Sequence, residues 1–219
     1  MIPGVRLVVL GKQGAGKGTQ CLQLARHYVV PHISTGDIFR AAGKAGTEMG
    51  KVFASYLEAG KLVPDEVVIG IVAERLSERD ARGRGFILDG FPRTTHQAEA
   101  LGKLLSPMKL DAVIDLEVPT DVVVRRLENR RVCITCGHNY SVDQRPKYNW
   151  SCDHCGGEVV QRDDDKPEAI QTRLELYERQ TKPLIDWYRE RQLLASIDGT
   201  KDPDAIFQLV VDAIEARRV

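Results

Sequence analysis

The segment that most constrains this chain is a glycine-rich run at residues 11–20, which reads G-K-Q-G-A-G-K-G-T-Q and follows the apolar stretch 5–10. An apolar strand that leads through a glycine-rich turn into a helix aims backbone N–H groups and the positive end of the helix dipole at one point. Lys17 adds a positive charge that can reach phosphate oxygens. The pattern therefore predicts a phosphate-binding loop. Gly18 stands where a hydroxyl residue commonly follows the lysine, and Thr19 comes one position later.

Length and charge narrow the class of protein. The chain has 219 residues, enough for one substantial core with insertions, and its 31 basic and 31 acidic side chains balance. Balanced charge argues against a broad nucleic-acid footprint or a general affinity for anionic membranes. The N-terminal residues lack the charged and then apolar pattern of an export signal, and no segment has the length of a transmembrane helix. We therefore expect a cytoplasmic protein.

Strand-like apolar runs alternate with helical patterns along the chain. The expected strands are 5–10, 32–34, 86–88, 112–116 and 193–197. The expected helices are 17–28, 47–59, 65–78, 95–105, 120–129, 167–191 and 203–216. Because strands that alternate with helices pair in parallel, this order predicts a three-layer α/β fold with a five-stranded parallel sheet flanked by helices.

Two segments break this alternation. Residues 34–63 are helical in pattern, rich in Ala and Gly, and contain no strand signal. Residues 130–165 are rich in Cys, Asn, Pro and Asp and show no helical period. We interpret both as insertions into one core domain, made of residues 1–33, 64–129 and 166–219.

Four cysteines form two C-x-x-C pairs. Cys133 and Cys136 are separated from Cys152 and Cys155 by fifteen residues, a spacing typical of zinc sites built from two turns. Four thiolates close a tetrahedral site and leave no position for a substrate, so the expected role is structural. Zinc is the expected metal, and iron in a similar cage is the alternative.

Three other potential ligands need separate interpretations. His138 and His154 lie near the cysteines and are alternative metal ligands, but exposed turn histidines are the favoured interpretation. Cys21 lies on the helix that follows the phosphate loop. We expect it to be a small buried apolar residue instead of a reactive thiol.

The strand-like run 86–88 leads into Asp89 and the turn G-F-P-R at 90–93. Ligands of open α/β sheets bind at the carboxyl ends of the strands, the same edge that carries the phosphate loop. An aspartate that ends an apolar strand is typical of an aspartate associated with magnesium in nucleotide enzymes, with a turn or cap role as the alternative. Arg93 is expected at the same edge.

Four more arginines complete the candidate chemistry. Arg126 and Arg130 are four residues apart and share a helix face, while Arg162 and Arg173 flank the start of a long helix. Each alone is typical of a solvated surface charge, but together with a phosphate loop they favour a cluster that neutralises phosphoryl oxygens. Phosphoryl transfer to an ionised phosphate needs positioning and charge stabilisation more than a general base.

The motifs together are specific and span nearly the whole chain. They are the loop 11–20, S-T-G-D at 34–37 followed by Arg40, D-G-F-P-R-T at 89–94 followed by Gln97, R-R-V at 130–132, Arg162 with Asp164 and Asp165, Arg173, and D-G-T-K at 198–201. With these residues the chain resembles the adenylate kinase family, in the long-lid form that carries four cysteines.

The resemblance implies the reaction ATP + AMP = 2 ADP in adenine nucleotide homeostasis, with Mg²⁺ accompanying ATP and Zn²⁺ as a structural ion. It implies an AMP-binding insertion at 34–63, a lid at 130–165, and a monomer without nucleic-acid or membrane partners. The residues that match ATP-binding positions are Gly14, Ala15, Gly16, Lys17, Gly18, Thr19, Arg130, Asn139, Tyr140 and Lys201. Those that match AMP-binding positions are Thr35, Arg40, Lys61, Leu62, Val63, Gly90, Phe91, Pro92, Arg93, Gln97, Arg162 and Arg173.

The remaining positions match catalytic roles. Arg162 and Arg173 would bridge the phosphates with Arg126 beside them, and Asp164 and Asp165 resemble carboxylates at the lid hinge that assist closure. The chain departs from the family pattern at Gln13, which replaces a proline, and at Asp163 and Asn139.

Three rival interpretations remain. A related nucleoside monophosphate kinase could use GTP as donor or a pyrimidine monophosphate as acceptor, with the same fold. A P-loop ATPase could use a zinc ribbon to bind nucleic acid, although the acidic residues in 130–166 oppose contact with a phosphate backbone. An inactive scaffold would leave Lys17 and the arginines unused.

Overall fold

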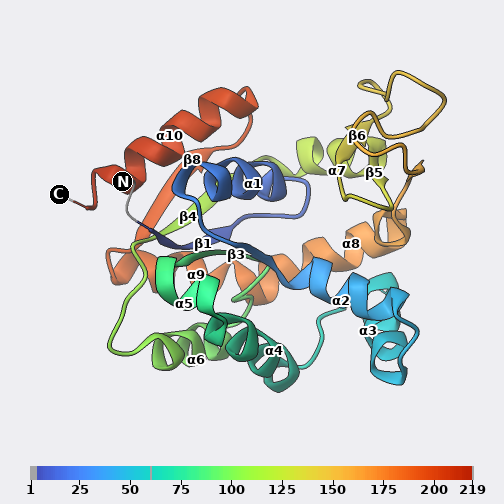
Figure 1. The fold of residues 1–219 in the computed structure, drawn as a ribbon. Coiled ribbons are helices and arrows are strands. Elements are labelled where there is room, and N and C mark those ends of the chain that lie inside the picture. The colour runs from blue at the N-terminus through green and yellow to red at the C-terminus, as the bar shows by residue number, and fades with distance from the viewer. Residues whose placement is uncertain (1–3, 60, 219) are drawn as a thin grey trace.

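The computed structural model describes residues 4–59 and 61–218. Its centre is a five-stranded parallel sheet in the order β2-β3-β1-β4-β8, which confirms the predicted fold class (Figure 1). The strands are β1 (Arg6–Leu10), β2 (His32–Ser34), β3 (Phe86–Asp89), β4 (Ala112–Glu117) and β8 (Leu194–Asp198).

Helices cover both faces of this sheet. In chain order, the helices of the described ranges are α1 (Lys17–Tyr28), α2 (Thr35–Lys44), α3 (Glu48–Glu58), α4 (Asp65–Ser77), α5 (Arg79–Arg84), α6 (Thr95–Leu105), α7 (Thr120–Asn129), α8 (Pro167–Leu176), α9 (Pro183–Glu190) and α10 (Pro203–Glu215). No helix within the described ranges is both long and apolar enough to cross a membrane.

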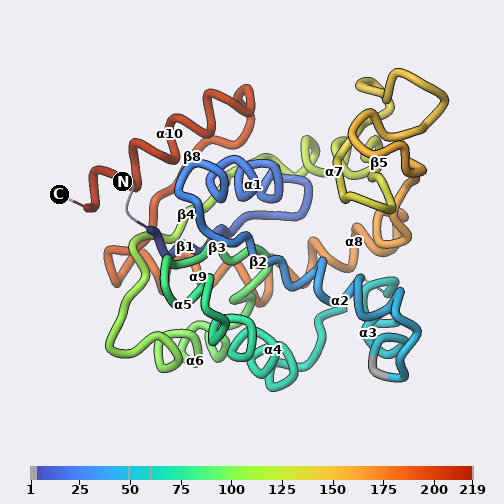
Figure 2. The backbone as a smooth tube through the Cα atoms, in the orientation of Figure 1, coloured from blue at the N-terminus to red at the C-terminus, as the bar shows by residue number. Residues whose placement is uncertain are grey.

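The strands are apolar on both faces because each face packs against helices. In β1, Leu7 and Val9 join a buried cluster with residues of α1, α7, α8 and α10, whereas Val8 and Leu10 join a second cluster with residues of α4, α6 and α9. The two ends of the described chain lie together, where Arg218 donates a hydrogen bond to the Gly4 carbonyl (Figure 2).

The long helix predicted at 167–191 is interrupted. It consists of α8, a π-helical turn at Tyr177–Thr181, and α9. Pro183 has no N–H group and clashes with a continuous helix, so the preceding turn widens, and the Lys182 amide bonds to the Tyr177 carbonyl at 2.8 Å. Ile170, Leu174, Tyr177, Leu184 and Tyr188 are nevertheless buried along this segment.

Residues 35–58 form the helical pair α2 and α3. Phe39 and Phe53 stack across the pair with ring centroids 4.8 Å apart. A Cβ on Gly50 would lie 2.0 Å from the Ala42 carbonyl oxygen, so the close approach of the two helices requires glycine there. The pair stands beside the sheet at the edge where β2 ends (Figure 2).

Residues 130–160 form a small antiparallel sheet in the order β6-β5-β7. Its strands are β5 (Arg130–Cys133), β6 (Asn139–Ser141) and β7 (Val159–Val160). The sequence pattern did not predict these strands, because two to four residues are too few to show an alternating period. Cys133, Cys152 and Val159 are buried in a cluster of their own, and Tyr140 and Trp150 pack against it.

Candidate active site

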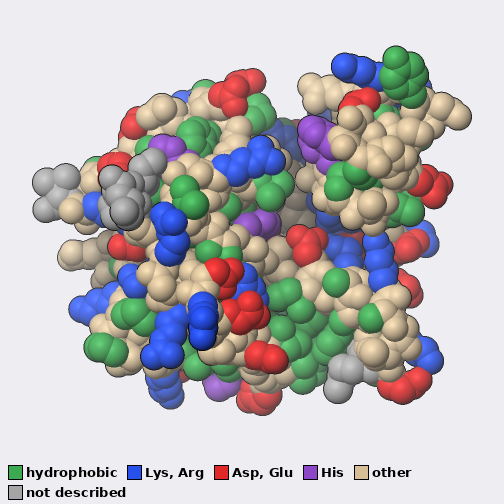
Figure 3. Space-filling view, viewed as in Figure 1, with side chains coloured by type: hydrophobic (Ala, Val, Ile, Leu, Met, Phe, Trp, Pro, Cys, Tyr) green, Lys and Arg blue, Asp and Glu red, His purple; other side chains and the backbone are tan. Residues whose placement is uncertain are grey.

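The carboxyl ends of the parallel strands open into a cleft of about 1540 Å³. Its walls come from the phosphate loop, from α2, and from β5 and β6. A space-filling view shows the hollow that separates the lobe of residues 130–160 from the core (Figure 3). Segments far apart in the sequence therefore face one cavity, which is large enough for two nucleotides.

The loop between β1 and α1 has the backbone of a phosphate site. Gly14 has φ +82°, and a Cβ there would lie 2.8 Å from the Val123 carbonyl oxygen. Gly16 takes a left-handed conformation at the start of α1, where no described side chain caps the helix and the first turn holds no acidic residue. The N–H groups at this helix end are therefore available to an anion.

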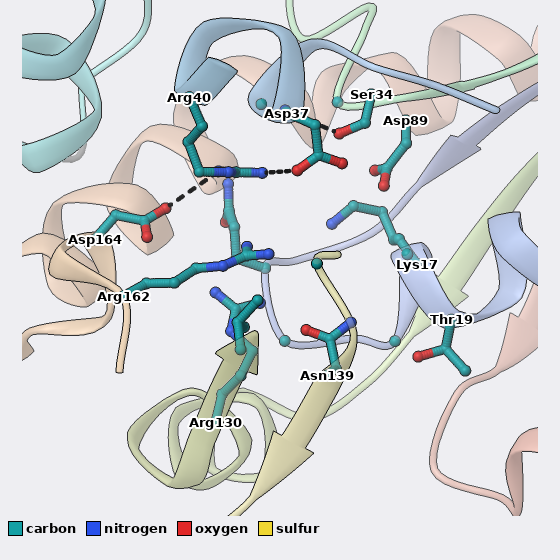
Figure 4. A pocket seen from close by; sticks show the side chains of 18 of the residues that line it. Lys17, Thr19, Ser34, Asp37, Arg40, Asp89, Arg130, Asn139, Arg162 and Asp164 are labelled. Carbon is teal, nitrogen blue, oxygen red and sulfur yellow. Dashed lines mark hydrogen bonds and ion pairs between the residues drawn. The ribbon is translucent and has the colours of Figure 1, made fainter. Parts of the chain in front are cut away.

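Lys17 is held by its own loop. Its Nζ donates hydrogen bonds to the carbonyls of Gly11 at 2.8 Å and Lys12 at 2.9 Å. Burial lowers the pKa of Lys17 to about 8, against the attraction of Asp89. The ammonium and the Asp89 carboxylate face each other across the base of the cleft (Figure 4). A phosphate group would favour the charged form of this lysine.

Asp89 ends β3 beside this lysine. Its Oδ2 lies 3.5 Å from His32 Nε2. Burial acts to raise the pKa of Asp89, but His32, Lys17 and Arg93 outweigh it and the net pKa is lowered. The carboxylate is therefore ionised in the cleft and can hold a hydrated divalent cation.

Five arginines of the cleft lie close enough to influence one another, and they are Arg40, Arg93, Arg130, Arg162 and Arg173. Burial lowers the pKa of Arg93 to about 10, with repulsion from Arg173 as the next cause. Burial and repulsion from Arg130 and Arg40 lower the pKa of Arg162 to about 10. Burial is the main cause of both shifts and repulsion between guanidinium groups is the second, and a bound phosphate would relieve that repulsion.

Two aspartates hold this arginine group in place. Arg130 makes a bidentate pair with Asp165 at 2.8 and 2.5 Å. Arg173 donates to the Asp164 carbonyl at 2.7 Å and lies 3.1 Å from its carboxylate. Arg40 lies 3.8 Å from the same carboxylate (Figure 4). Charge-assisted contacts of this kind fix where the guanidinium groups point.

Comparison with known proteins agrees with this geometry. A family model described as "Adenylate kinase" matches residues 9–193. An adenylate kinase from Thermodesulfovibrio yellowstonii is 51% identical over 216 residues, covering 97% of this chain and 100% of the relative. The adenylate kinase from Desulfitobacterium hafniense is 52% identical over 214 residues, covering 96% and 98%, and that from Archaeoglobus fulgidus is 49% identical with the same coverage.

The chain belongs to the adenylate kinase family. Its function is that of an adenylate kinase, the reversible transfer of a phosphoryl group between ATP and AMP to form two ADP. The expected activity and fold are thereby confirmed.

The structure places most residues expected from the family resemblance on the cleft wall. These are Gly14, Ala15, Gly16, Lys17, Gly18, Thr19, Arg40, Asp89, Gly90, Pro92, Arg93, Arg126, Arg130, Asn139, Tyr140, Arg162, Asp164, Arg173 and Lys201. Arg126 donates to the carbonyls of Gly199 at 3.1 Å and Ala15 at 3.5 Å, so it ties the phosphate loop to the turn after β8.

Other expected residues do not line this cleft. They are Thr35, Lys61, Leu62, Val63, Phe91, Gln97 and Asp165. Gln97 is 1% exposed, accepts a hydrogen bond from the Arg93 amide at 2.7 Å and donates one to Asp65 at 2.7 Å. Thr35 donates to the Gly90 carbonyl at 3.0 Å. Both residues brace the turn that carries Arg93.

The sequence reasoning missed one contact across the cleft. Lys44, at the end of α2, donates a hydrogen bond to the carbonyl of Ile134 in the cysteine-bearing segment at 2.7 Å. These residues are 90 positions apart. No local pattern marks such a pair, because exposed lysines are common on helices.

The four cysteines meet as the spacing predicts. Cys133 Sγ lies 3.5 Å from Cys155 Sγ, and the four sulfur atoms all lie within 4.8 Å of one another. A tetrahedral zinc ion with Zn–S bonds of about 2.3 Å needs sulfur separations of about 3.8 Å, so the set fits this metal. The rings of His138 and His154 stack with centroids 4.0 Å apart and are not part of the sulfur set.

The surroundings of the sulfur set favour a bound thiolate. Tyr140 Oη donates to Cys152 Sγ at 3.4 Å, and so does the His154 amide. Burial acts to raise the pKa of Cys152, but these hydrogen bonds, together with the Cys155 backbone amide and the Cys136 thiol, lower it to about 6. Outer hydrogen bonds of this kind orient metal ligands and tune their charge.

Proposed function

We propose that the cleft binds ATP and AMP together, with the ATP phosphates on the loop 11–20 and the AMP phosphate near Arg40 and Arg93. The observation that carries this proposal is the placement of charge: Lys17 and the open end of α1 lie in the phosphate loop, and five arginines line the same cleft. The space between them would hold the transferred group. Arg162 and Arg173 would contact the phosphates of both substrates.

Catalysis in this site would come from positioning and electrostatics. The AMP phosphate is an ionised nucleophile, so it needs no general base. As charge develops on the transferred phosphoryl group, Lys17 and the arginines would stabilise it more than the ground state. Mg²⁺ accompanies ATP in this family, and Asp89 would hold that ion through water.

We further infer three functional regions: a core of residues 1–33, 64–129 and 166–219, an AMP-binding insertion at 34–63, and a lid at 130–165. The contact of Lys44 with Ile134 supports this proposal, because it joins the inserted helices to the lid at the mouth of the cleft. A lid that closes over both nucleotides would exclude water and suppress ATP hydrolysis. Asp164 and Asp165 would set the hinge by holding Arg173 and Arg130.

The AMP base would lie near the residues that brace the 90–93 turn. Gln97 has amide donor and acceptor groups that suit an adenine edge. In the structure, the Gln97 amide oxygen accepts from the Arg93 amide, and its NH₂ group donates to Asp65. To bind adenine, Gln97 would have to give up the hydrogen bond to Asp65 and donate to the base instead. Thr35, Lys61, Leu62 and Val63 do not line the open cleft, so they would contact AMP only after this side of the pocket rearranges around the base.

The lid metal is proposed to be Zn²⁺ in a structural role, held by Cys133, Cys136, Cys152 and Cys155. Asn139 and Tyr140 of the same lobe would lie against ATP. Lys201 would approach it from the turn after β8. The balanced charge and the family resemblance favour a cytoplasmic monomer without a nucleic-acid or membrane partner.

Arg93→Ala is expected to raise the KM for AMP by about 10- to 100-fold, because it removes charge-assisted hydrogen bonds to the AMP phosphate. The KM for ATP should change much less. Arg130→Ala is the reciprocal variant and should affect ATP more than AMP. Steady-state kinetics with each substrate varied in turn measures the split, and equal effects of Arg93→Ala on both substrates would refute the assignment.

The pH dependence of kcat/KM for ATP should show an alkaline decline near pH 8. Burial lowers the pKa of Lys17 to about 8, so the ammonium that binds phosphate is present below that pH and is lost above it. A profile from pH 7 to 10 measures the decline. The Lys12→Ala variant should show the same alkaline decline. A kcat/KM that stays constant up to pH 10 in the parent enzyme would show that Lys17 stays charged and would contradict the prediction.

A further inference from the structure

Three side chains with metal-binding atoms meet beneath the phosphate loop. They are Cys21 of α1, His32 of β2 and Asp89 of β3, and their ligand atoms all lie within 4.8 Å of one another. The proposed reaction uses Asp89 alone among them. This group is separate from the four cysteines of the lid.

The fold explains why they meet. Residues 32 and 89 lie on neighbouring parallel strands, where His32 pairs with Ile87 and Ser34 with Asp89. Ile33 and Leu88 pack in the cluster on the other side of the sheet, so His32 and Asp89 face α1. Cys21 comes one helical turn after Lys17 and is 0% exposed.

The imidazole of His32 makes only a long contact with the Asp89 carboxylate. Its Nε2 is buried and has no hydrogen-bond partner within the described ranges, although it lies 3.5 Å from Asp89 Oδ2. That separation is an ion-pair distance without hydrogen-bond alignment. A buried polar atom without a partner is costly, and coordination of a cation is one way to satisfy it.

The donor set selects a class of cation. Sulfur, imidazole nitrogen and carboxylate oxygen suit Zn²⁺ and disfavour Mg²⁺ and Ca²⁺, which prefer oxygen ligands. Three protein ligands leave one tetrahedral position open. His32 and Asp89 line the cleft, so this position would face the nucleotide phosphates.

We propose that Cys21, His32 and Asp89 form a second zinc site at the base of the cleft, and that zinc bound there inhibits the enzyme. The Cys21 thiol would release its proton to solvent as the sulfur binds the ion. Zinc would remove Asp89 from its role toward Mg²⁺ and would repel the Lys17 ammonium. That repulsion also makes the site weaker than the lid cluster, which suits reversible inhibition.

The direct test is equilibrium dialysis with zinc alone, on protein whose lid cluster already holds one zinc per chain. The parent should bind a second equivalent, and excess MgATP should weaken that binding. Cys21→Ala should retain the first equivalent and lose the second, and His32→Gln should do the same. His138→Ala, which alters an exposed histidine pair, should leave the second site intact.

Initial rates at excess Mg²⁺ supply the second measurement. Cys21→Ala should keep the parent rate without zinc and require roughly 100-fold more zinc for half inhibition. Added Cd²⁺ should produce more ultraviolet thiolate absorption in the parent than in Cys21→Ala. The inhibition assay depends on the adenylate kinase reaction, whereas dialysis and absorption do not.

Two outcomes would overturn the proposal. Saturation at one zinc per chain in the parent would show that no second site exists. Equal zinc inhibition of the parent and Cys21→Ala would show that zinc acts elsewhere, for example as a complex with ATP.

Discussion

Lys17→Ala is expected to lower kcat by about 10²- to 10³-fold, because it removes one preorganised positive charge from the transferred phosphoryl group. The KM for ATP should rise as well, since the same charge contacts the ground-state phosphates. Folding should persist. Burial lowers the pKa of Lys17, so the native site already disfavours the ammonium and gains little stability from it.

Lys12→Ala is the matched control for this variant. Lys12 lies in the same loop, but its Nζ donates to Thr120 Oγ1 at 2.8 Å and lies 3.7 Å from Glu178, on the outer side of the loop. It should turn over at nearly the parent rate. A Lys17→Ala enzyme with normal kcat, or one whose loss matches that of Lys12→Ala, would remove Lys17 from the mechanism.

Loss of the lid metal is expected to destabilise the enzyme strongly. Structural zinc contributes on the order of 10 kcal/mol to the folding of small modules. Even a partial loss through Cys152→Ser should lower Tm by about 10 °C or more. At low temperature the initial rate should fall by a smaller factor, because the thiolates leave no open position for chemistry. Differential scanning calorimetry and rate assays at about 10–15 °C, well below a mesophilic Tm of about 45–65 °C, compare the two effects.

His138→Ala is the matched control for the metal variant. In the parent, the His138 ring packs against His154 beside the cluster, and neither histidine is one of the four sulfur ligands. The variant's Tm and zinc content should equal those of the parent. If Cys152→Ser or chelation abolished turnover while Tm stayed unchanged, the cluster would have a chemical role and the structural assignment would be wrong.

Local motifs made much of this site predictable. The phosphate loop needs glycines, a lysine and a helix start within ten residues, and the cysteine pairs place four ligands on two turns. Arg93 and Asp89 follow from the rule that sites form at the carboxyl ends of parallel strands. Each of these motifs lies within a short stretch of residues, so one sequence is enough to recognise it.

Contacts between distant residues were not predictable in this way. The bond from Lys44 to Ile134 and the meeting of Cys21 with His32 depend on how separate elements pack. The strands of the lid were too short to show a period. The hydrogen bond from Gln97 to Asp65 was also not predictable, because Asp65 belongs to no recognisable motif.

The departure from the family pattern at Gln13 has no structural explanation. Gln13 lines a small second cavity with Arg93, Arg173 and Tyr177, and its Oε1 is buried without a hydrogen-bond partner in the described part of the chain. Nothing in the structure shows why glutamine replaces proline at this position.

The most direct test of a two-nucleotide site is ADP formation by the parent enzyme from MgATP, with AMP, GMP, UMP, CMP or no acceptor. The charge placement and the family predict rapid ADP formation with AMP, much slower transfer to the other monophosphates, and almost none without an acceptor. Faster transfer to UMP or CMP than to AMP would contradict the proposed acceptor site. Equal ADP formation without any acceptor would identify an ATPase and contradict the whole account.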